Sequence, residues 1–587
     1  MKWLVWVLAA VLVPAVFAQE GSITLLALSE RADGSQAGAV ADLDVRIEPG
    51  KNRVFLETFP LTKITTQISM RFAQQVACKE LDIDCSDKDF FFTIRALPGI
   101  VGGPSAGSAA AMLVGSLIAN VQLRNDTAIT GTINSGGVIG PVGGIKEKLE
   151  AAAKAGLTRM LIPRGTRELK DNTTNKSIDL VVYGSERGVE VIEVSTFLEA
   201  LEQYTGKTFP RVTGELVIEP RYLTTMQEVA QDLCNRTTEI KELLDERRTN
   251  LSNTTELEQT AVNMSMRSRE AMAAGQYYAA ASFCFRSNVQ YKRALALQRP
   301  WTEHQIAKAL LEIKGMAVNI SNQIDARPIT TITDLQTYMA VKERVFEVED
   351  TFLEIVSKLN ETKQNAERLA YAEERLFSAV TWARFFNGDD KKFVIDTASL
   401  RDSCIAKISE AEERINYVRS FLPTSLGEAR RELDKSYQDL STNNFTLCLY
   451  KASKVKAEAD VILGIIGVEE NKLDNLIGLK LGIVKDTIVK SQQKGIFPII
   501  GYSYYEYAQS LKSFDRYSTL LFSEYALEFS NLDLYFAKDK TRERKLWDVI
   551  EPHVPWIGVG ILIGIFLMVL FETIARARDQ KATKRRR

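Results

Sequence analysis

The stretch from Gly103 to Gly156 constrains the fold more than any other part of the chain. It reads GPSAGSAAAMLVGSLIANVQLRNDTAITGTINSGGVIGPVGGIKEKLEAAAKAG. Ala, Met, Leu and Val dominate the segment between Ser105 and Ala119, so the helix predicted there is apolar on most sides and has to be buried. Segments of strand character precede and follow it. The stretch therefore predicts a domain of mixed strands and helices, with this helix packed against a sheet.

Ser105 stands at the predicted start of this apolar helix, where it can act as a nucleophile. Pro104 suits a first helical turn because its missing N–H would have had no partner there. Glycines such as Gly103 let backbone and substrate approach closely. The free N–H groups of the Gly103, Pro104 and Ala106 turn can hold an oxyanion. A serine hydroxyl still needs a base before it can attack.

Lysine is the candidate base, because the chain has only two histidines. His304 and His553 lie far downstream, which argues against a Ser/His/Asp triad. Lys146 and Lys148 compete for the role. At about 100° per residue, Ile145 belongs to the buried stripe of the predicted helix and Lys148 falls at the edge of that stripe. Lys146 falls on the opposite, solvent-exposed face. Burial lowers the pKa of a lysine toward the free amine that a general base requires, and this favours Lys148.

Three blocks of sequence carry a family resemblance. They are the GPSAG around Ser105, the Thr130-Gly-Thr-Ile segment, and Pro141-Val-Gly-Gly-Ile-Lys-Glu-Lys148. Their order and spacing resemble the proteolytic domain of Lon peptidases over residues 22–205. The resemblance implies that Ser105 is the nucleophile, that Lys148 is its partner, and that Thr130 lies beside this dyad.

The chain also departs from the ATP-dependent members of that family. Val101-Gly102 stands before GPSAG where the cytosolic Lon has Lys-Asp. This variant resembles the ATPase-free, secreted or membrane-attached Lon-like proteins, for which an archaeal source is expected. No Walker motif occurs in the chain, so we expect no cofactor and an activity that does not need ATP.

The first folded domain is predicted to be α+β and to span residues 19–210. It combines short strands with helices, and the catalytic groups lie at the ends of these elements. The expected strands are Ser22–Leu28, Ala39–Ile47, Arg53–Thr58, Phe90–Arg95, Ala128–Ile133, Arg159–Pro163 and Leu180–Gly184. The expected helices are Lys63–Lys79, Ser105–Ala119, the Lys148 helix and Ser195–Tyr204.

The sequences at the two ends of the chain predict where the protein lies relative to a membrane. Residues 1–18 are typical of a signal peptide that is removed before Gln19. Residues 553–575 are apolar enough to predict one transmembrane helix, and the basic residues 576–587 are typical of a cytoplasmic flank. We therefore expect a single-pass membrane protein with its domains outside the cytoplasm. Ten Asn-x-Ser/Thr sequons agree with a glycosylated surface: Asn125, Asn172, Asn175, Asn235, Asn250, Asn253, Asn263, Asn319, Asn360 and Asn444.

Residues 211–552 are predicted to form an all-α, repeat-like domain. Residues 226–297 and 398–463 look like two copies of one unit, because each contains two cysteines at a similar separation. An even set of six cysteines fits three bridges in an oxidising compartment. The expected pairs are Cys78–Cys85, Cys234–Cys284 and Cys404–Cys448. Helical arrays of this kind usually present a binding surface or act as spacers.

Charge and composition exclude several other functions. The formal net charge is -1, so no strong field attracts nucleic acid. No CxxC pair or histidine partner predicts a metal site. The preferred hypothesis is a membrane-anchored serine endopeptidase that acts on unfolded or surface proteins. A catalytically silent scaffold and a self-processing peptidase are the alternatives, and a homo-oligomer is left open.

Overall fold

The computed structural model describes residues 19–537 and 554–584, apart from the short segments 31–35, 60–63, 97–99, 102, 171–176, 212–213, 250–252, 387, 389, 423–425, 467 and 469. The expected signal peptide, residues 1–18, lies outside the described residues. The chain divides into two compact units. The first contains Met1–Lys391 and Ile395–Phe536, and the second contains Lys392–Val394 and Ala537–Arg587.

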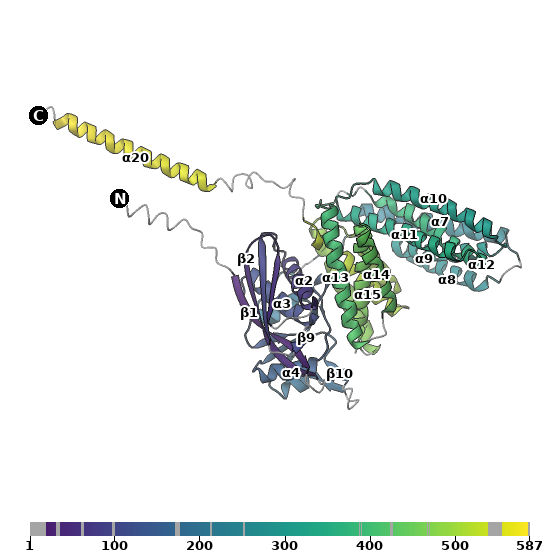
Figure 1. Ribbon diagram of the computed structural model, residues 1–587, viewed down its shortest axis with the longest axis horizontal. Helices are drawn as coiled ribbons and strands as arrows, with labels where there is room; N and C mark the ends of the chain where they lie inside the picture. The colour runs from purple at the N-terminus through teal and green to yellow at the C-terminus, as the bar shows by residue number, and fades with distance from the viewer. Residues whose placement is uncertain are drawn as a thin grey trace. The chain divides into compact units, whose positions relative to one another are not determined.

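Strands and helices alternate in the N-terminal part of the first unit (Figure 1). The strands are β1 (Gln19–Glu30), β2 (Gln36–Pro49), β3 (Val54–Phe59), β4 (Lys88–Ala96), β5 (Ile100–Val101), β6 (Thr127–Ile129), β7 (Thr132–Ile133), β8 (Ile139–Gly140), β9 (Arg159–Pro163), β10 (Glu168–Lys170), β11 (Ser177–Asp179) and β12 (Glu190–Val194). The helices are α2 (Ile64–Glu80), α3 (Gly107–Ile118), α4 (Ile145–Lys154), α5 (Leu180–Ser185) and α6 (Phe197–Thr205), with 3-10 turns η1 (Pro104–Ala106) and η2 (Ser135–Gly137).

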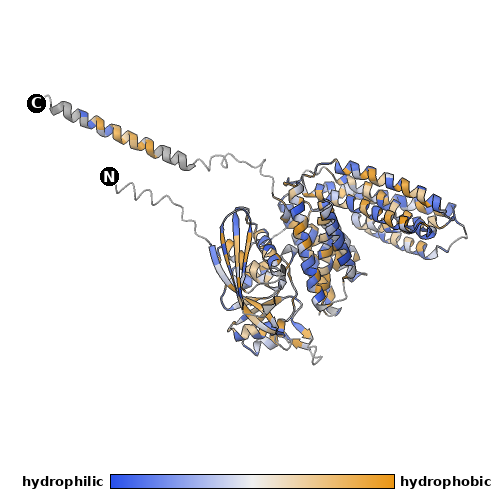
Figure 2. Cartoon of the chain, viewed as in Figure 1, coloured by the Kyte–Doolittle hydropathy of each residue, from blue (hydrophilic) through white to orange (hydrophobic). Residues whose placement is uncertain are grey.

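A five-stranded sheet forms the larger layer of this part. Its order is β3-β4-β2-β1-β5, and only the β3–β4 pair is parallel. Leu43, Val45 and Ile47 alternate along β2 toward the buried face, and the colours of the strands alternate accordingly in Figure 2. The apolar helix α3 and helix α2 cover that face and share one core with it. The prediction that this apolar helix packs against a sheet is therefore confirmed.

A smaller parallel sheet, in the order β12-β9-β6, lies beside helix α4. Ile145, Leu149 and Ala152 of α4 are buried together with residues of this sheet, such as Met160. The helical phase derived from the sequence is confirmed by this packing. Strand β6 ends next to Thr130, so the smaller sheet delivers one of the candidate site residues.

Two predicted strands of this domain differ from the structure. The predicted strand Ala128–Ile133 is divided into β6 and β7, which belong to different sheets and leave Thr130 and Gly131 between them. The segment Leu180–Gly184 is not a strand, because residues Leu180–Ser185 form helix α5. The carboxylate of Asp179 accepts hydrogen bonds from the backbone N–H groups of Val181, at 2.9 Å, and Val182, at 3.4 Å. This N-cap satisfies the first turn of the helix and outweighs the strand preference of the β-branched valines. The strand beside β9 is instead β12, which the sequence analysis did not predict.

The rest of the first unit is helical. Its helices are α7 (Pro220–Glu246), α8 (Thr255–Ala273), α9 (Tyr277–Ala296), α10 (Glu303–Asp325), α11 (Ile332–Ser357), α12 (Thr362–Trp382), α13 (Thr397–Phe421), α14 (Gly427–Ser441), α15 (Phe445–Ile465), α16 (Leu473–Gln493), α17 (Ile499–Leu511) and α18 (Arg516–Phe529). Short 3-10 turns are η3 (Ala383–Phe385), η4 (Glu470–Lys472) and η5 (Leu532–Tyr535).

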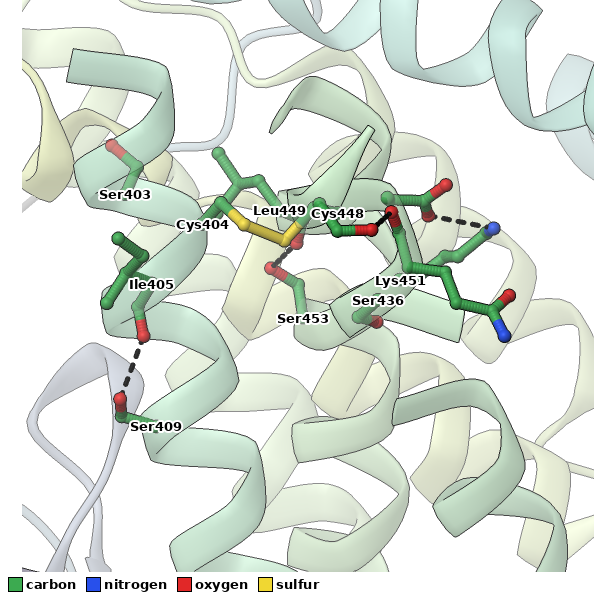
Figure 3. Close-up of a disulfide and its surroundings, with 12 residues drawn as sticks. Ser403, Cys404, Ile405, Ser409, Ser436, Cys448, Leu449, Lys451 and Ser453 are labelled. Atoms are coloured by element: carbon green, nitrogen blue, oxygen red, sulfur yellow. Dashed lines mark hydrogen bonds and ion pairs between the residues drawn. A yellow bond between two sulfur atoms is a disulfide. The ribbon is translucent and has the colours of Figure 1, made fainter. Parts of the chain in front are cut away.

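Two groups of three helices repeat the same arrangement. Helix α9 packs against both α7 and α8, and helix α15 packs against both α13 and α14. A disulfide joins α7 to α9 through Cys234 and Cys284, and another joins α13 to α15 through Cys404 and Cys448 (Figure 3). The third disulfide, Cys78–Cys85, joins the last turn of α2 to the segment that follows it. These are the pairs expected from the sequence, and the common arrangement supports the expected duplication.

The second unit corrects the prediction about the membrane. It contains helix α20 (Val554–Lys584), which continues past the apolar run into charged residues, where Glu572 and Arg576 pair at 3.5 Å. Within the part of the chain that the structure describes, no helix is both long and apolar enough to span a bilayer. The predicted transmembrane helix at residues 553–575 is therefore wrong, and so is the single-pass membrane localisation that depended on it.

The two kinds of disulfide loop predict different losses of stability. Removing Cys404–Cys448 by a double change to alanine frees a 44-residue loop, whereas removing Cys78–Cys85 frees a 7-residue loop. Loop-closure entropy predicts losses of about 4 and about 2 kcal/mol, respectively. Chemical unfolding of both double variants measures the difference. An equal loss in the two variants would contradict the entropic explanation.

Candidate active site

Ser105 lies in the 3-10 turn η1, directly before helix α3. Gly103 precedes the turn in an extended conformation, and a Cβ placed on it meets nothing within 4 Å. Open space therefore lies in front of the turn, as a substrate chain requires. Gly107 behaves differently, because a Cβ there would lie 3.1 Å from Cγ2 of Ile133. Its lack of a side chain lets α3 approach β7 closely.

Backbone hydrogen bonds join the serine turn to the segment that carries Thr130. The N–H of Gly131 donates to the carbonyl of Ser105 at 3.3 Å, and the N–H of Ser108 donates to the carbonyl of Gly131 at 3.2 Å. Thr130 itself is fixed by its N–H, which donates to the carbonyl of Leu161 in β9 at 3.1 Å. Ser105 and Thr130 are thus held next to each other by the main chain.

Lys148 reaches the same segment from helix α4. Its Nζ donates to Oγ1 of Thr130 at 3.1 Å, and both side chains are buried. The segment Thr130–Gly131 is therefore contacted from two sides, by the side chain of Lys148 at Thr130 and by the backbone of Ser105 at Gly131. Lys146 does not enter this group, because its ammonium lies over the ring of Tyr183, 5.8 Å from the centroid.

The electrostatic setting of Lys148 favours the free amine. Burial lowers the pKa of Lys148 to about 7, and only the neighbouring Glu147 acts in the opposite direction. Lys407 and Lys456 are as deeply buried, with 1% of the side chain exposed against 2% for Lys148. Both pair with Glu528, however, and the nearby carboxylates outweigh burial and raise the pKa of each lysine. A hydroxyl as the partner therefore distinguishes Lys148 from Lys407 and Lys456, which form ion pairs with Glu528.

Two glycines set the start of the lysine helix. Gly144 has a φ of +67°, in the left-handed region, and a Cβ on it would lie 2.6 Å from the side chain of Leu28. Both the conformation and the close approach require glycine at this position. The carbonyl of Gly144 then accepts the N–H of Lys148 at 2.9 Å, one turn into the helix. The position of this turn determines where the amine points.

Sequence analysis missed the contribution of helix α13, which lies far along the chain. Arg414 and Tyr417 of this helix form hydrogen bonds to both ends of the segment that joins β7 to α4. No local motif marks these residues, because an arginine and a tyrosine on a helix are common in any sequence. Only the tertiary contact reveals them.

Comparison with known proteins identifies the domain. Residues 63–197 match the Lon protease (S16) C-terminal proteolytic domain. The Lon protease of Methylocella silvestris is 49% identical over 78 residues, which are 13% of this chain and 10% of that protein. The Lon protease of Paraburkholderia phytofirmans is 33% identical over 140 residues, covering 23% of this chain and 17% of that protein. Residues 63–197 are a Lon-type proteolytic domain.

The matched residues include Ser105, Thr130 and Lys148. A longer match, to the Lon protease of Syntrophomonas wolfei, is 28% identical over 232 residues and covers 37% of this chain. Across these three relatives the chain spans only 10% to 27% of the relative's length. The likeness to these relatives therefore covers at most 37% of this chain and does not extend over most of any of the three.

The low pKa of Lys148 predicts how reactivity depends on pH. Below a pKa of about 7 the side chain is an ammonium ion and cannot accept the proton of Ser105, whereas above it the amine is free. Labelling of Ser105 by a fluorophosphonate should rise with pH through this value. Between pH 7 and the ordinary pKa of lysine, Lys148 is a free amine in the folded state but an ammonium in the unfolded state. The free energy of unfolding contributed by this group therefore increases as pH rises through that range. A pH-independent labelling rate would contradict the assignment.

Thr130 can be tested separately from the lysine. Thr130→Val keeps the shape of the side chain but removes the acceptor that contacts Lys148. Labelling of Ser105 should slow about tenfold, the equivalent of one hydrogen bond, and its pH midpoint should fall because the ammonium form loses a partner. Thr130→Ser keeps the hydroxyl and serves as the control. A valine variant with the wild-type pH profile would show that the contact has no role.

Proposed function

We propose that the chain is a serine endopeptidase that uses a Ser105/Lys148 dyad and needs no ATP. The observation that supports this most is the buried amine of Lys148, which has Thr130 as its hydrogen-bond partner, in a Lon-type domain that also carries the serine turn. A buried, neutral lysine next to a helix-initiating serine is the arrangement that base-assisted nucleophilic attack requires.

In the proposed reaction Lys148 takes the proton of the Ser105 hydroxyl while Oγ attacks a peptide carbonyl. Backbone N–H groups at the start of η1 and α3 stabilise the negative charge that develops on the carbonyl oxygen. The ammonium of Lys148 then gives its proton to the leaving amine, and an acyl-enzyme remains. A water molecule, deprotonated by the same amine, releases the acid product. Thr130 holds Lys148 in place throughout.

We further propose that the substrates are unfolded polypeptides. The sequence has no Walker motif that would predict a motor to unfold and thread folded proteins. Nothing lies within 4 Å of a Cβ placed on Gly103, so the backbone before the serine turn is not covered at that point. The three disulfides favour a compartment in which cysteines stay oxidised.

Two lysine variants test the proposal. Lys148→Met should reduce cleavage of unfolded casein, measured without ATP, to the level of Ser105→Ala, because the proton acceptor is lost. Lys146→Ala should leave the activity unchanged, since Lys146 lies over Tyr183 on the other side of the helix. Equal losses in the two lysine variants would refute the assignment of the base.

The same preparation separates the alternatives. A wild-type protein that neither cleaves casein nor reacts with a fluorophosphonate would favour a silent scaffold. Mass spectrometry that finds only an internal cut, present in wild type and absent in Ser105→Ala, would favour self-processing. Cleavage of casein by the intact chain supports the endopeptidase.

A further inference from the structure

One turn of helix α13 contacts both halves of the candidate site. Its Glu413, Arg414 and Tyr417 all face the Lon-type domain. Oε1 of Glu413 accepts the hydroxyl of Ser69 in α2 at 2.7 Å. Ser69 in turn flanks the serine turn, because its Cβ lies 3.7 Å from the place where a Cβ on Gly107 would stand. Helix α13 therefore reaches the side of the site that carries Ser105.

Arg414 holds the beginning of the segment that leads to the lysine helix. Its Nη2 donates to the carbonyl of Ile133 at 2.9 Å and to Oδ1 of Asn134 at 2.6 Å. Ile133 lies three residues after Thr130 and packs against Gly107. A guanidinium with two acceptors in a fixed geometry defines both the position and the orientation of this backbone.

Tyr417 holds the other end of the same segment. Its hydroxyl accepts the N–H of Gly143 at 2.9 Å. Gly143 precedes the left-handed Gly144, whose carbonyl accepts the N–H of Lys148. The phenol thus fixes the residue directly before Gly144, the N-cap of α4, and through the first turn of that helix it sets the direction of the Lys148 amine.

Buried ion pairs fix helix α13 itself. Nε of Arg414 lies 3.2 Å from Oδ1 of Asp460 on α15, and Asp460 also pairs with Lys456 at 3.3 Å. The ammonium of Lys456 lies 3.4 Å from the hydroxyl of Ser135 in the connecting segment. The disulfide between Cys404 and Cys448 joins the same two helices covalently. An element that is held this firmly can define the position of a neighbouring loop.

We propose that Arg414 and Tyr417 are positioning residues for Lys148, so that the helical domain completes the catalytic site of the Lon-type domain. This inference rests on the proposed Ser105/Lys148 chemistry. It assigns the helical domain a role in catalysis itself, in addition to any role in presenting substrates. Both residues act through the segment between β7 and α4.

The inference predicts a specific defect when the phenol is removed. Without the acceptor for Gly143, the first turn of α4 can shift and admit water to Lys148. A better hydrated ammonium has a higher pKa, so the free amine is rarer near neutral pH. The lysine is also less well aligned with the serine, and a misplacement of about 1 Å can cost about a hundredfold in rate.

Tyr417→Phe in the full-length chain tests this with a change of one oxygen atom. We expect fluorophosphonate labelling of Ser105 at pH 7 to slow at least about tenfold, and its pH midpoint to move upward from that of the wild type. Raising the pH should restore part of the rate. The control is Tyr338→Phe, which removes a hydroxyl that donates to Asp325 in the helical domain away from the site. It should keep the wild-type rate and midpoint.

Arg414→Lys provides a second variant that keeps the positive charge beside Asp460 but loses the guanidinium Nη2 that donates to Ile133 and Asn134. It should change rate and midpoint in the same direction as Tyr417→Phe, while denaturant midpoints confirm that both variants fold. Wild-type rates and midpoints in both folded variants would overturn the inference and leave the dyad intact. A wild-type protein that does not label at any pH would instead overturn the proposed function.

Discussion

A lysine amine buried without a carboxylate is the interaction on which the candidate site depends. Within the described residues, the hydrogen bond of Lys148 is to Thr130, and burial lowers its pKa to about 7. Lys456 shows what happens when a glutamate is added at equal depth, since its pKa is raised. The fold therefore has to exclude both water and acidic side chains from the environment of Lys148. That requirement explains why α4 packs its apolar stripe against a sheet and begins at a glycine.

The requirement extends beyond the Lon-type domain. A buried amine stays out of contact with water only while the backbone around it stays in place. The segment between β7 and α4 is fixed in part by its own buried residues Val138, Ile139 and Val142 and by the pairing of β8 with β7. The helical domain adds to this constraint through hydrogen bonds from α13 and through the buried ion pairs behind it. Charges that are buried for this purpose are costly unless each is paired. The network of Asp460, Lys456 and Glu528 supplies such pairing.

The sequence predicted those parts of the site in which local pattern and physics coincide. Helical phase separated Lys148 from Lys146, and the glycines around Ser105 indicated a close approach of the backbone, which Gly107 makes to Ile133. Contacts between distant segments could not be predicted in this way, because nothing local links Arg414 to Ile133. The predicted strand at Leu180–Gly184 failed because a side-chain cap from Asp179 outweighed β propensity. The predicted transmembrane helix rested on the apolar run alone. In the structure the same helix, α20, continues beyond that run into charged turns.

The disulfides of the helical domain have a consequence for a protein that cuts polypeptides. Each of the two long bridges closes a covalent ring that includes a whole intervening helix, α8 in one case and α14 in the other. A single cut inside such a ring opens the loop but releases no fragment, so the two new ends stay tethered and the helices on either side can remain packed. Nicked molecules would keep the mass of the intact chain, apart from one added water, until a reductant is present.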